Sequence, residues 1–561
     1  MAANNEDAAK YVKDKTTIHV QHDGRFGPDA AYIVMVAADK GQAASGYEDL
    51  TLWETVAKFK FASLYCFIAA MSAAADGYQL SMSGNIVANK AFVAMFATET
   101  NAKGQRYLAS GILSGWSAAQ NVCQIIGQTG HGFVCARYGR KAGMLCLWTI
   151  LAGSVFAETL STDWQSWLVG RGLGGIGVGG LQTTILGYIA EVAPVRIRGA
   201  LLMSYSFWWG IGTWCTHMAL YAMNTENPND FRTPIYTQWG QIGLMAIIYL
   251  ILPESPAWCA TVGEEKRAKK ALGQVNRGVK DYDPDYQYHV LTLNVDHERA
   301  VAKELENEKW WAIFKGTDGR RTITALWTIV AQQFLGLALF GTFGTYFFQQ
   351  AGIEDPFKVK AITSSVGTVT TVAAMLLVDH YGRRLMACTM TTLMWICCVI
   401  CGILGVVPES NATVPVFVLF TCLWNVGIAA NGAAGWGYIG EISSQRLRPY
   451  TSGFAASANS LGGLIMTILT PFMVNANQWN WKYRTGWFYA GVGLLWVIGM
   501  WILIPETAGR SSAELDELFE RKIKPWRFHK TETATQALLR AEKETQEAEK
   551  NKNGDMIGHN P

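Results

Sequence analysis

Twelve apolar blocks, each about twenty residues long, restrict what this chain can fold into. They lie at 61–82, 107–127, 142–160, 165–190, 199–222, 236–252, 323–350, 359–379, 385–407, 413–440, 450–474 and 484–504. Because about twenty apolar residues are needed to cross the ~30 Å hydrocarbon core of a bilayer, each block predicts one membrane-spanning helix. Half of the 561 residues are hydrophobic and only 16% are charged, whereas soluble domains carry roughly 25% charged residues. We therefore expect an all-α membrane protein with twelve transmembrane helices.

A polar interval divides these blocks into six and six, and two motifs recur at matching places. The motif RYGRK at 137–141 follows the second block and DHYGRR at 379–384 follows the eighth, while PESP at 253–256 closes the sixth block and PETAGR at 505–510 closes the twelfth. Equivalent motifs at equivalent places indicate two pseudo-symmetric six-helix bundles. The expected division is a polar segment at 1–60, bundles at 61–252 and 323–504, a central loop at 253–322 and a tail at 505–561.

The orientation in the membrane depends on the long polar segments, because the short loops carry similar numbers of Lys and Arg on both sides. The basic interval 253–322 shares a side with both polar tails, and the sequon Asn411-Ala-Thr413 falls on the opposite side. We therefore expect cytoplasmic termini in a multi-pass protein, with Asn411 outside as a glycosylation site. Residues 1–60 have no apolar core typical of a secretory signal, so the first block is expected to direct its own insertion.

Several functional classes do not fit this composition. The net charge is only +3 and the basic residues form no stripe, so nucleic acid is not an expected partner. The group Cys397, Cys398 and Cys401 lies in an apolar block, where a thiol acts as a small hydrophobe rather than a metal ligand. Outside the blocks we find no arrangement typical of a catalytic triad, metal site or nucleotide loop, so we expect neither an enzyme nor a cofactor.

An ordered series of further motifs runs along most of residues 50–520. These are LTLW at 50–53, DGYQLSMSGN at 76–85, GRGLGGIGVGG at 170–180, EVAPVRIRG at 191–199, TYFFQQAG at 345–352, EISSQRLRPYT at 441–451 and PETAGRS at 505–511. In these motifs the chain resembles the sugar porter family of major facilitators, in particular the fungal maltose/α-glucoside permease branch. The resemblance implies transport of a disaccharide, α-glucoside or hexose by alternating access, with a proton as the co-transported ion, in the plasma membrane.

The resemblance also suggests where proton coupling resides, although this chain departs from the family at that point. The family places an aspartate after Gly-Tyr on the first span and pairs it with the span-four arginine, but here Gln79 follows Tyr78. An amide cannot titrate. Asp76 lies one helical turn before Gln79 on nearly the same face, so our hypothesis is that Asp76 with Arg171 carries coupling. The alternative is that Asp76 caps the span or faces water.

A sugar presents hydroxyls around a ring and apolar C–H faces, so amides and aromatic rings suit it. By resemblance, Gln332 and Gln333 on span seven contact hydroxyls and Trp436 on span ten supplies a ring. Tyr346, Asn459 and Thr213 are further candidates from spans seven, eleven and five. The alternative for all of these polar groups is hydrogen bonding between helices.

Charged residues in the loop motifs are expected to form a gate that joins the halves at the cytoplasmic side. The candidates are Arg140, Glu191, Arg198, Glu254, Asp379, Arg383, Glu441, Arg446 and Glu506. Exposed ion pairs contribute only ~0–1 kcal/mol each, which suits a contact that opens in every cycle. The glycines of span four, Gly170, Gly172, Gly174, Gly175, Gly177 and Gly179, are expected to allow close helix packing rather than to bind phosphate.

Four departures from the family pattern leave other functions open. They are Gln79, Ala136, Ala338 and Ala433. One alternative is a carrier of a sugar acid or a quinate-like polyol, which would require an unpaired cation, with Arg171 as the candidate. The other is a sugar sensor that binds its ligand without transporting it.

Overall fold

The computed structural model describes residues 51–533, apart from 102–103, 105, 281, 308–309, 409, 444–446, 508–511 and 532. Within this part the chain is almost wholly helical. Its one described sheet is a hairpin in which β1 (Glu99–Thr100) pairs antiparallel with β2 (Arg106–Tyr107). Glu99 lies opposite Tyr107 in this hairpin.

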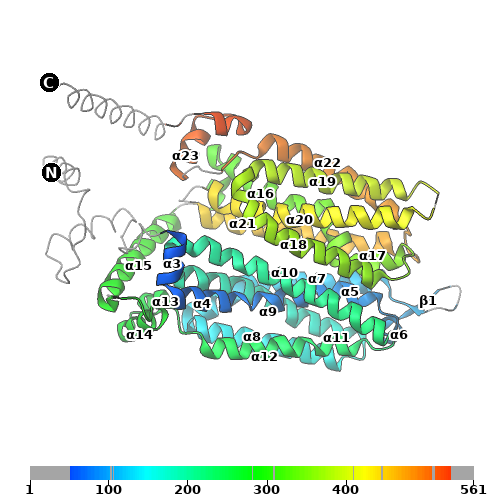
Figure 1. The fold of residues 1–561 in the computed structure, drawn as a ribbon, viewed down its shortest axis with the longest axis horizontal. Helices are drawn as coiled ribbons and strands as arrows, with labels where there is room; N and C mark the ends of the chain where they lie inside the picture. Colours follow the sequence, from blue (N-terminus) through cyan, green and yellow to red (C-terminus); the bar gives the residue numbers. More distant parts are fainter. Residues whose placement is uncertain are drawn as a thin grey trace, which may run out of the picture.

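Two helical bundles lie side by side with their long axes in the same direction (Figure 1). The first contains α4 (Lys60–Ala70), α5 (Ala73–Asn85), α7 (Ser110–Tyr138), α8 (Arg140–Leu160), α9 (Trp164–Val192), α10 (Arg198–Glu226), α11 (Arg232–Tyr236) and α12 (Gln238–Ile251). The second contains α16 (Gly316–Gln332), η4 (Gln333–Thr342), α17 (Gly344–Gln350), α18 (Pro356–Tyr381), α19 (Arg383–Leu404), α20 (Thr413–Ile442), α21 (Arg448–Val474) and α22 (Thr485–Leu503). Each predicted block overlaps one of these helices or helix series. The predicted all-α membrane fold with two pseudo-symmetric bundles is confirmed.

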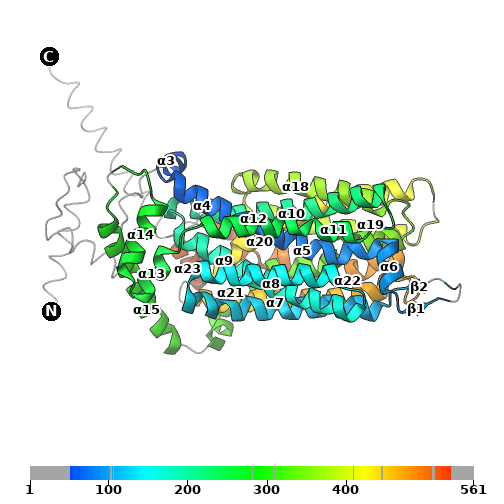
Figure 2. The same cartoon turned by 90° about the horizontal axis from the view of Figure 1, so that it is seen from below.

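The two ends of the molecule differ. At one end, called here the hairpin end, lie β1, β2, η1 (Ile86–Ala88) and α6 (Lys90–Phe96), and Figure 2 shows the same arrangement in a perpendicular view. At the other end, called the α15 end, lie α3 (Leu52–Lys58), α13 (Pro256–Val262), α14 (Glu265–Val275), α15 (Pro284–Asn307) and α23 (Ser512–Glu520). The remaining short helices are η2 (Val195–Ile197), η3 (Trp310–Phe314), η5 (Lys482–Arg484) and η6 (Pro525–Lys530). The interval predicted as a loop at 253–322 is therefore largely helical.

Seven of the described helices are long and apolar enough to cross a membrane, and nine segments are if each of two bent helix pairs counts as one span. The two longest helices outside that set, α7 and α10, have 29 residues each but are more polar. Both pack against the opposite bundle, α7 on α21 and α10 on α18. Their polar side chains therefore face protein rather than lipid, where burial without a partner would be costly.

Helix α7 continues well beyond the end predicted from hydropathy at residue 127. Its last turns are polar, but their side chains are satisfied by neighbouring helices. His131 Nε2 lies 3.1 Å from the carbonyl oxygen of Gly143 in α8, and Cys135 Sγ lies 3.3 Å from Thr184 Oγ1 in α9. These contacts explain why the helix reaches Tyr138 although its apolar pattern has ended.

The repeat inferred from the motifs appears in the structure as matching contacts. In the first bundle the Glu254 carboxylate accepts a hydrogen bond of 2.9 Å from the backbone N–H of Arg140, at the start of α8. In the second, Glu506 accepts one of 3.0 Å from the backbone N–H of Arg383, at the start of α19. A carboxylate at a helix N-terminus satisfies unpaired donors and interacts favourably with the helix dipole.

A second pair of matching contacts supports the same symmetry. The Tyr188 hydroxyl in α9 donates a hydrogen bond of 3.0 Å to the Pro253 carbonyl, and the Tyr438 hydroxyl in α20 donates one of 3.2 Å to the Pro505 carbonyl. The PES and PET motifs thus make the same contact in the two halves. This contact joins the fourth span of each bundle to the end of the sixth.

Glycine is required at the turn that precedes each of these helix starts. Gly139 has φ 104° and Gly382 has φ 84°, in a region that other residues rarely adopt. A Cβ at Gly139 would lie 2.5 Å from Glu254 Oε2, and a Cβ at Gly382 would lie 2.7 Å from Glu506 Oε2. A side chain at either position would strain the backbone and displace the carboxylate.

Close packing of α7 on α9 confirms the role expected for the span-four glycines. A Cβ at Gly179 would lie 2.1 Å from the carbonyl oxygen of Gln124, and one at Gly175 would lie 2.4 Å from that of Gln120. The two backbones can approach this closely only because no side chain stands between them.

We predict that Gly382→Ala lowers the stability of the protein by about 1–3 kcal/mol, because alanine is strained at this φ and collides with Glu506. The matched control is Gly187→Ala in α9, where no atom lies within 4 Å of the added Cβ. The melting temperatures of the detergent-purified proteins measure both effects. An unchanged melting temperature for Gly382→Ala would contradict the strain assigned to this turn.

Candidate functional site

A buried ion pair lies at the centre of the first bundle. Arg171 Nη1 in α9 is 2.9 Å from Glu158 Oε1 in α8, and both side chains are fully buried. Gln79 Nε2 donates a hydrogen bond of 2.6 Å to the same Glu158 oxygen, and Gln238 Nε2 in α12 donates one of 3.2 Å to Oε2. Both oxygens of Glu158 are thus held by helices on three sides.

Asp76 is also fully buried, but its partners are neutral. Its Oδ2 accepts hydrogen bonds of 2.9 Å from Gln182 Nε2 in α9 and from the Tyr205 hydroxyl in α10. Within the described part of the chain, its other oxygen, Oδ1, has no hydrogen-bond partner. The Asp76 carboxylate is therefore buried inside the bundle and forms no ion pair with the described residues.

The expected pairing of Asp76 with Arg171 is wrong for this structure. Gln182 and Arg171 are eleven residues apart on α9, or about 16 Å along the helix, and Asp76 bonds to Gln182. Arg171 instead takes its countercharge from Glu158, a residue that our sequence reasoning missed. A signal was available, since a carboxylate inside the apolar block 142–160 is rare in a membrane helix and marks a partnered or functional group.

The departure from the family at Gln79 has a structural explanation. Gln79 cannot supply a negative charge to Arg171, but its side-chain amide donates to Glu158 and its backbone carbonyl oxygen accepts a hydrogen bond of 3.2 Å from Arg171 Nη2. The negative charge beside the arginine has moved from the first span to the third.

A line of polar side chains marks the boundary between the two bundles. Trp214 Nε1 in α10 donates a hydrogen bond of 2.9 Å to Ser365 Oγ in α18, and Asn121 Nδ2 in α7 lies 3.4 Å from Thr467 Oγ1 in α21. Thr213, next to Trp214, lies 3.3 Å from Ser81 Oγ in α5. The amide and hydroxyl groups along this boundary are suited to hydrogen bonding with a polar solute.

The structure brings together some of the predicted binding residues. Gln333 Nε2 donates a hydrogen bond of 3.1 Å to Asn459 Oδ1 in α21, while Gln332 is half-buried and Tyr346 in α17 is buried. The side chain of Trp436 lies outside the described residues. Two of the predicted amides thus form one contact.

The seventh span is broken directly after these glutamines. Leu335 and Gly336 have non-helical backbone angles, and Gly336 has φ 93°. The carbonyl oxygen of Leu335 that this break frees accepts a hydrogen bond of 2.7 Å from Trp424 Nε1 in α20. Discontinuous helices of this kind occur at binding sites of secondary transporters, where irregular backbone lies against protein or a cavity.

The bundles are joined at the hairpin end by hydrogen bonds that sequence reasoning did not predict. Asn85 Oδ1 in α5 accepts from the backbone N–H of Thr345 at 3.1 Å and from its hydroxyl at 2.7 Å. Ser114 Oγ in α7 donates a hydrogen bond of 2.7 Å to the carbonyl oxygen of Ile468 in α21. In this structure the boundary between the bundles is closed at the hairpin end.

At the α15 end, the described contacts of the predicted gate residues hold helices of a single bundle together. Arg140 Nε donates to Glu191 at 3.1 Å, and Glu254 and Glu506 accept from helix N-termini within their own bundles. Arg198 begins α10, while the side chains of Asp379 and Glu441 and all of Arg446 lie outside the described residues.

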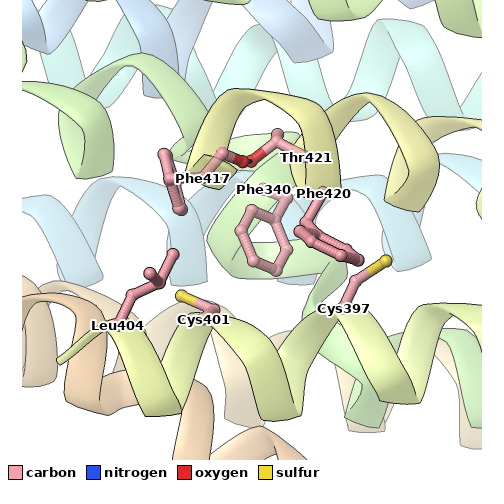
Figure 3. A pocket seen from close by; sticks show the side chains of 7 residues that line it. All are labelled: Phe340, Cys397, Cys401, Leu404, Phe417, Phe420 and Thr421. Carbon is pink, nitrogen blue, oxygen red and sulfur yellow. Dashed lines mark hydrogen bonds between the residues drawn. The ribbon is translucent and has the colours of Figure 1, made fainter. Parts of the chain in front are cut away.

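The cysteines singled out from the sequence belong to a packed apolar region. Cys397 and Cys401 line a hollow between α19, α20 and η4 together with Phe340, Leu404, Phe417, Phe420 and Thr421 (Figure 3). The hollow is too narrow for a water molecule and offers a single hydroxyl. It cannot provide the polar contacts that a polyhydroxylated solute needs.

Comparison with known proteins identifies the family. The family described as sugar (and other) transporter matches residues 65–519 of this chain. The chain belongs to this family. The resemblance to sugar porters of the major facilitator superfamily is thereby confirmed, and the chain is an integral, multi-pass membrane transporter.

Individual relatives agree with this assignment. The chain is 27% identical to the MFS transporter fmqE of Aspergillus fumigatus, over 87% of this chain and 93% of that protein. It is also 27% identical to a general α-glucoside permease of Saccharomyces cerevisiae, over 88% and 81%. Among solved structures, the inward open conformation of the xylose transporter XylE from E. coli has the same fold, with a TM-score of 0.65 at 20% identity, covering 81% of this chain and 98% of that one.

We predict that Glu158→Gln destabilises this transporter by about 3–5 kcal/mol, because it leaves the Arg171 charge buried and unpaired. Replacing both partners, as in Glu158→Leu with Arg171→Met, should recover most of the loss. Thermal unfolding of the purified proteins measures both. The matched control is Glu264→Gln, which removes an exposed ion pair with Arg267 and should cost less than about 1 kcal/mol. A Glu158→Gln protein as stable as this control would refute the structural role of the pair.

Proposed function

We propose that this transporter moves a sugar together with a proton across the plasma membrane by alternating access. The observation that carries the proposal is the pair of bundles joined at the hairpin end, with an amide contact between Gln333 and Asn459 beside the broken seventh span. A relative named as an α-glucoside permease and a structural neighbour described as a proton:xylose symporter support the same function.

The sugar would bind at the boundary between the bundles. Gln332, Gln333 and Asn459 offer amides to ring hydroxyls, and Tyr346 and Trp436 offer aromatic surface. The break at Leu335–Gly336 lets the segment carrying these amides move relative to α16 when solute binds. Binding of the sugar can in this way be coupled to opening of the boundary between the bundles at either end.

Asp76 is the better candidate for the coupling proton than Glu158. The Asp76 carboxylate is held by neutral donors, so it can gain or lose a proton without breaking an ion pair. Glu158 is neutralised by Arg171, and its protonation would leave that arginine unpaired. A proton entering along a 100 mV potential supplies roughly 2.3 kcal/mol, enough to concentrate a neutral sugar about fiftyfold.

The proposed orientation places the α15 end and both termini in the cytoplasm. Asn411 is exposed in the connection between α19 and α20, at the hairpin end, where it would be glycosylated on the outside (Figure 1). A cytoplasmic gate would then be formed by the charged residues of the loop motifs, closing when the hairpin end parts: Arg140, Glu191, Arg198, Glu254, Asp379, Arg383, Glu441, Arg446 and Glu506.

We predict that cells lacking their own sugar transporters accumulate a labelled hexose or maltose when they express this chain, and that an uncoupler abolishes accumulation. Asp76→Asn should abolish accumulation but retain exchange of labelled for unlabelled sugar, since exchange requires no net proton movement. The matched control is Asp296→Asn, which alters an exposed ion pair with Arg299 in α15. Uphill uptake that survives in Asp76→Asn would exclude Asp76 as the coupling site.

We also predict that Gln333→Ala raises the KM for sugar about tenfold, because each lost hydrogen bond costs about 0.5–1.5 kcal/mol. Thr421→Ala serves as the control, since the one bond of its hydroxyl among the described residues goes to the Phe417 carbonyl beside the apolar hollow. Initial rates of uptake over a range of sugar concentrations give both values. Equal KM values in the two variants would place sugar binding elsewhere.

A further inference from the structure

Two basic side chains are buried at the boundary between the bundles and have no part in the function described so far. Lys360 in α18 and His217 in α10 are each only 3% exposed. Helices α10 and α18 pack on each other across this boundary and carry one of the two side chains each. They lie on the hairpin-end side of the Trp214–Ser365 hydrogen bond.

The hydrogen-bonding capacity of these groups is not fully used. Lys360 Nζ donates to the carbonyl oxygens of Phe340 at 2.6 Å and Gly341 at 3.2 Å, which leaves one of its three donors available. Both ring nitrogens of His217 are buried and have no hydrogen-bond partner among the described residues. A buried imidazole without any partner is unusual, and its two ring nitrogens can contact a solute at this boundary.

Lys360 also has no ion-pair partner among the described residues. In that part of the chain no carboxylate forms a salt bridge with Lys360 or His217. The contrast with Arg171 is clear, because that arginine is neutralised by Glu158 and is not available to a solute. A buried ammonium is normally paired, and ionisable residues within the membrane commonly mark a substrate pathway.

We propose that His217 and Lys360 bind the carboxylate of an anionic sugar derivative, so that this carrier prefers sugar acids to neutral sugars. The inference rests on the proposed transport function and specifies its substrate class. The remaining Lys360 donor and one His217 N–H match the two oxygens of a carboxylate. A phosphate dianion has more acceptor oxygens and a larger charge than these two donors can satisfy.

The carboxylate site and the amide site are held by the same broken segment. The carbonyls that Lys360 contacts belong to η4, which begins at Gln333. Gly344, at the start of α17, leaves room for the lysine, because a Cβ there would lie 2.8 Å from Lys360 Nζ. A sugar acid could therefore place its carboxylate at Lys360 and its hydroxyls at the amides around Gln333.

The charge balance of transport then follows. One sugar-acid anion entering with one proton on Asp76 carries no net charge. A pH gradient drives such a cycle and a membrane potential does not. Transport of a neutral sugar with one proton would instead respond about fiftyfold to 100 mV.

The test uses the purified full-length protein in proteoliposomes, with labelled galacturonate, its uncharged methyl ester and galactose. We expect galacturonate to accumulate under an inward pH gradient, to be insensitive to a potassium–valinomycin potential, and to bind at least tenfold better than its methyl ester. Lys360→Met and His217→Gln should each reduce that preference at least tenfold, while Lys360→Arg should keep it. Lys358→Met, an exposed lysine on the same helix, is the matched control.

Each other outcome is decisive. Transport of galactose without transport or binding of galacturonate would overturn the carboxylate site and leave the proposed function standing. Competition by glucose 6-phosphate but not by galacturonate would also overturn it. A folded protein that moves none of these solutes, nor glucose or maltose, would overturn the transport function itself. If Lys360→Met does not fold, an unchanged preference in His217→Gln, measured by tryptophan fluorescence, would refute the inference.

Discussion

The buried ion pair between Glu158 and Arg171 fixes the arrangement of polar groups in the first bundle. In lipid an isolated charge is expensive, so Arg171 in α9 must have a counter-ion within reach. Glu158 provides it from α8, and Gln79 and Gln238 fill its remaining hydrogen-bonding positions from α5 and α12. Four helices thus converge on one carboxylate.

In this arrangement the carboxylate that neutralises Arg171 is not the carboxylate of the first span. Neutralising the arginine falls to Glu158, which is enclosed by donors. Asp76 is left with neutral partners, Gln182 and Tyr205, and one oxygen without a partner among the described residues. The loss of the family aspartate at Gln79 therefore does not remove a titratable carboxylate from the first span.

Much of the fold follows from the sequence because lipid imposes a simple rule. A backbone in hydrocarbon must satisfy its own hydrogen bonds, so about twenty apolar residues predict a helix, and every predicted block overlaps one. The repeated motifs predicted the equivalence of Glu254 and Glu506, but a gate between the halves was expected there, whereas the described contacts lie at helix N-termini within each bundle.

Other features depend on tertiary contacts and could not be read from periodicity. The break in span seven requires Gly336 to adopt a positive φ, and neighbouring Trp424 must satisfy the freed carbonyl. The partner of Arg171 depends on the direction in which side chains point. The Glu158 carboxylate could be seen in the sequence, but its position beside Arg171 could not. The helices α14 and α15 are too polar for a hydropathy argument to detect, and α13 is too short.

The buried cations have different partners inside the first bundle and at the boundary between the bundles. Inside the first bundle the arginine is neutralised within the protein, so its charge offers nothing to a ligand. At the boundary, Lys360 is held by carbonyl oxygens of a broken helix, which are partial charges and do not cancel it. A carboxylate arriving there would compete with these carbonyls for the ammonium. Since the carbonyls belong to η4, and η4 leads into α17 with its Thr345–Asn85 contact, occupancy of the site would alter the segment that closes the hairpin end. Recognition of an anionic solute and release of the outer closure would then depend on the same lysine.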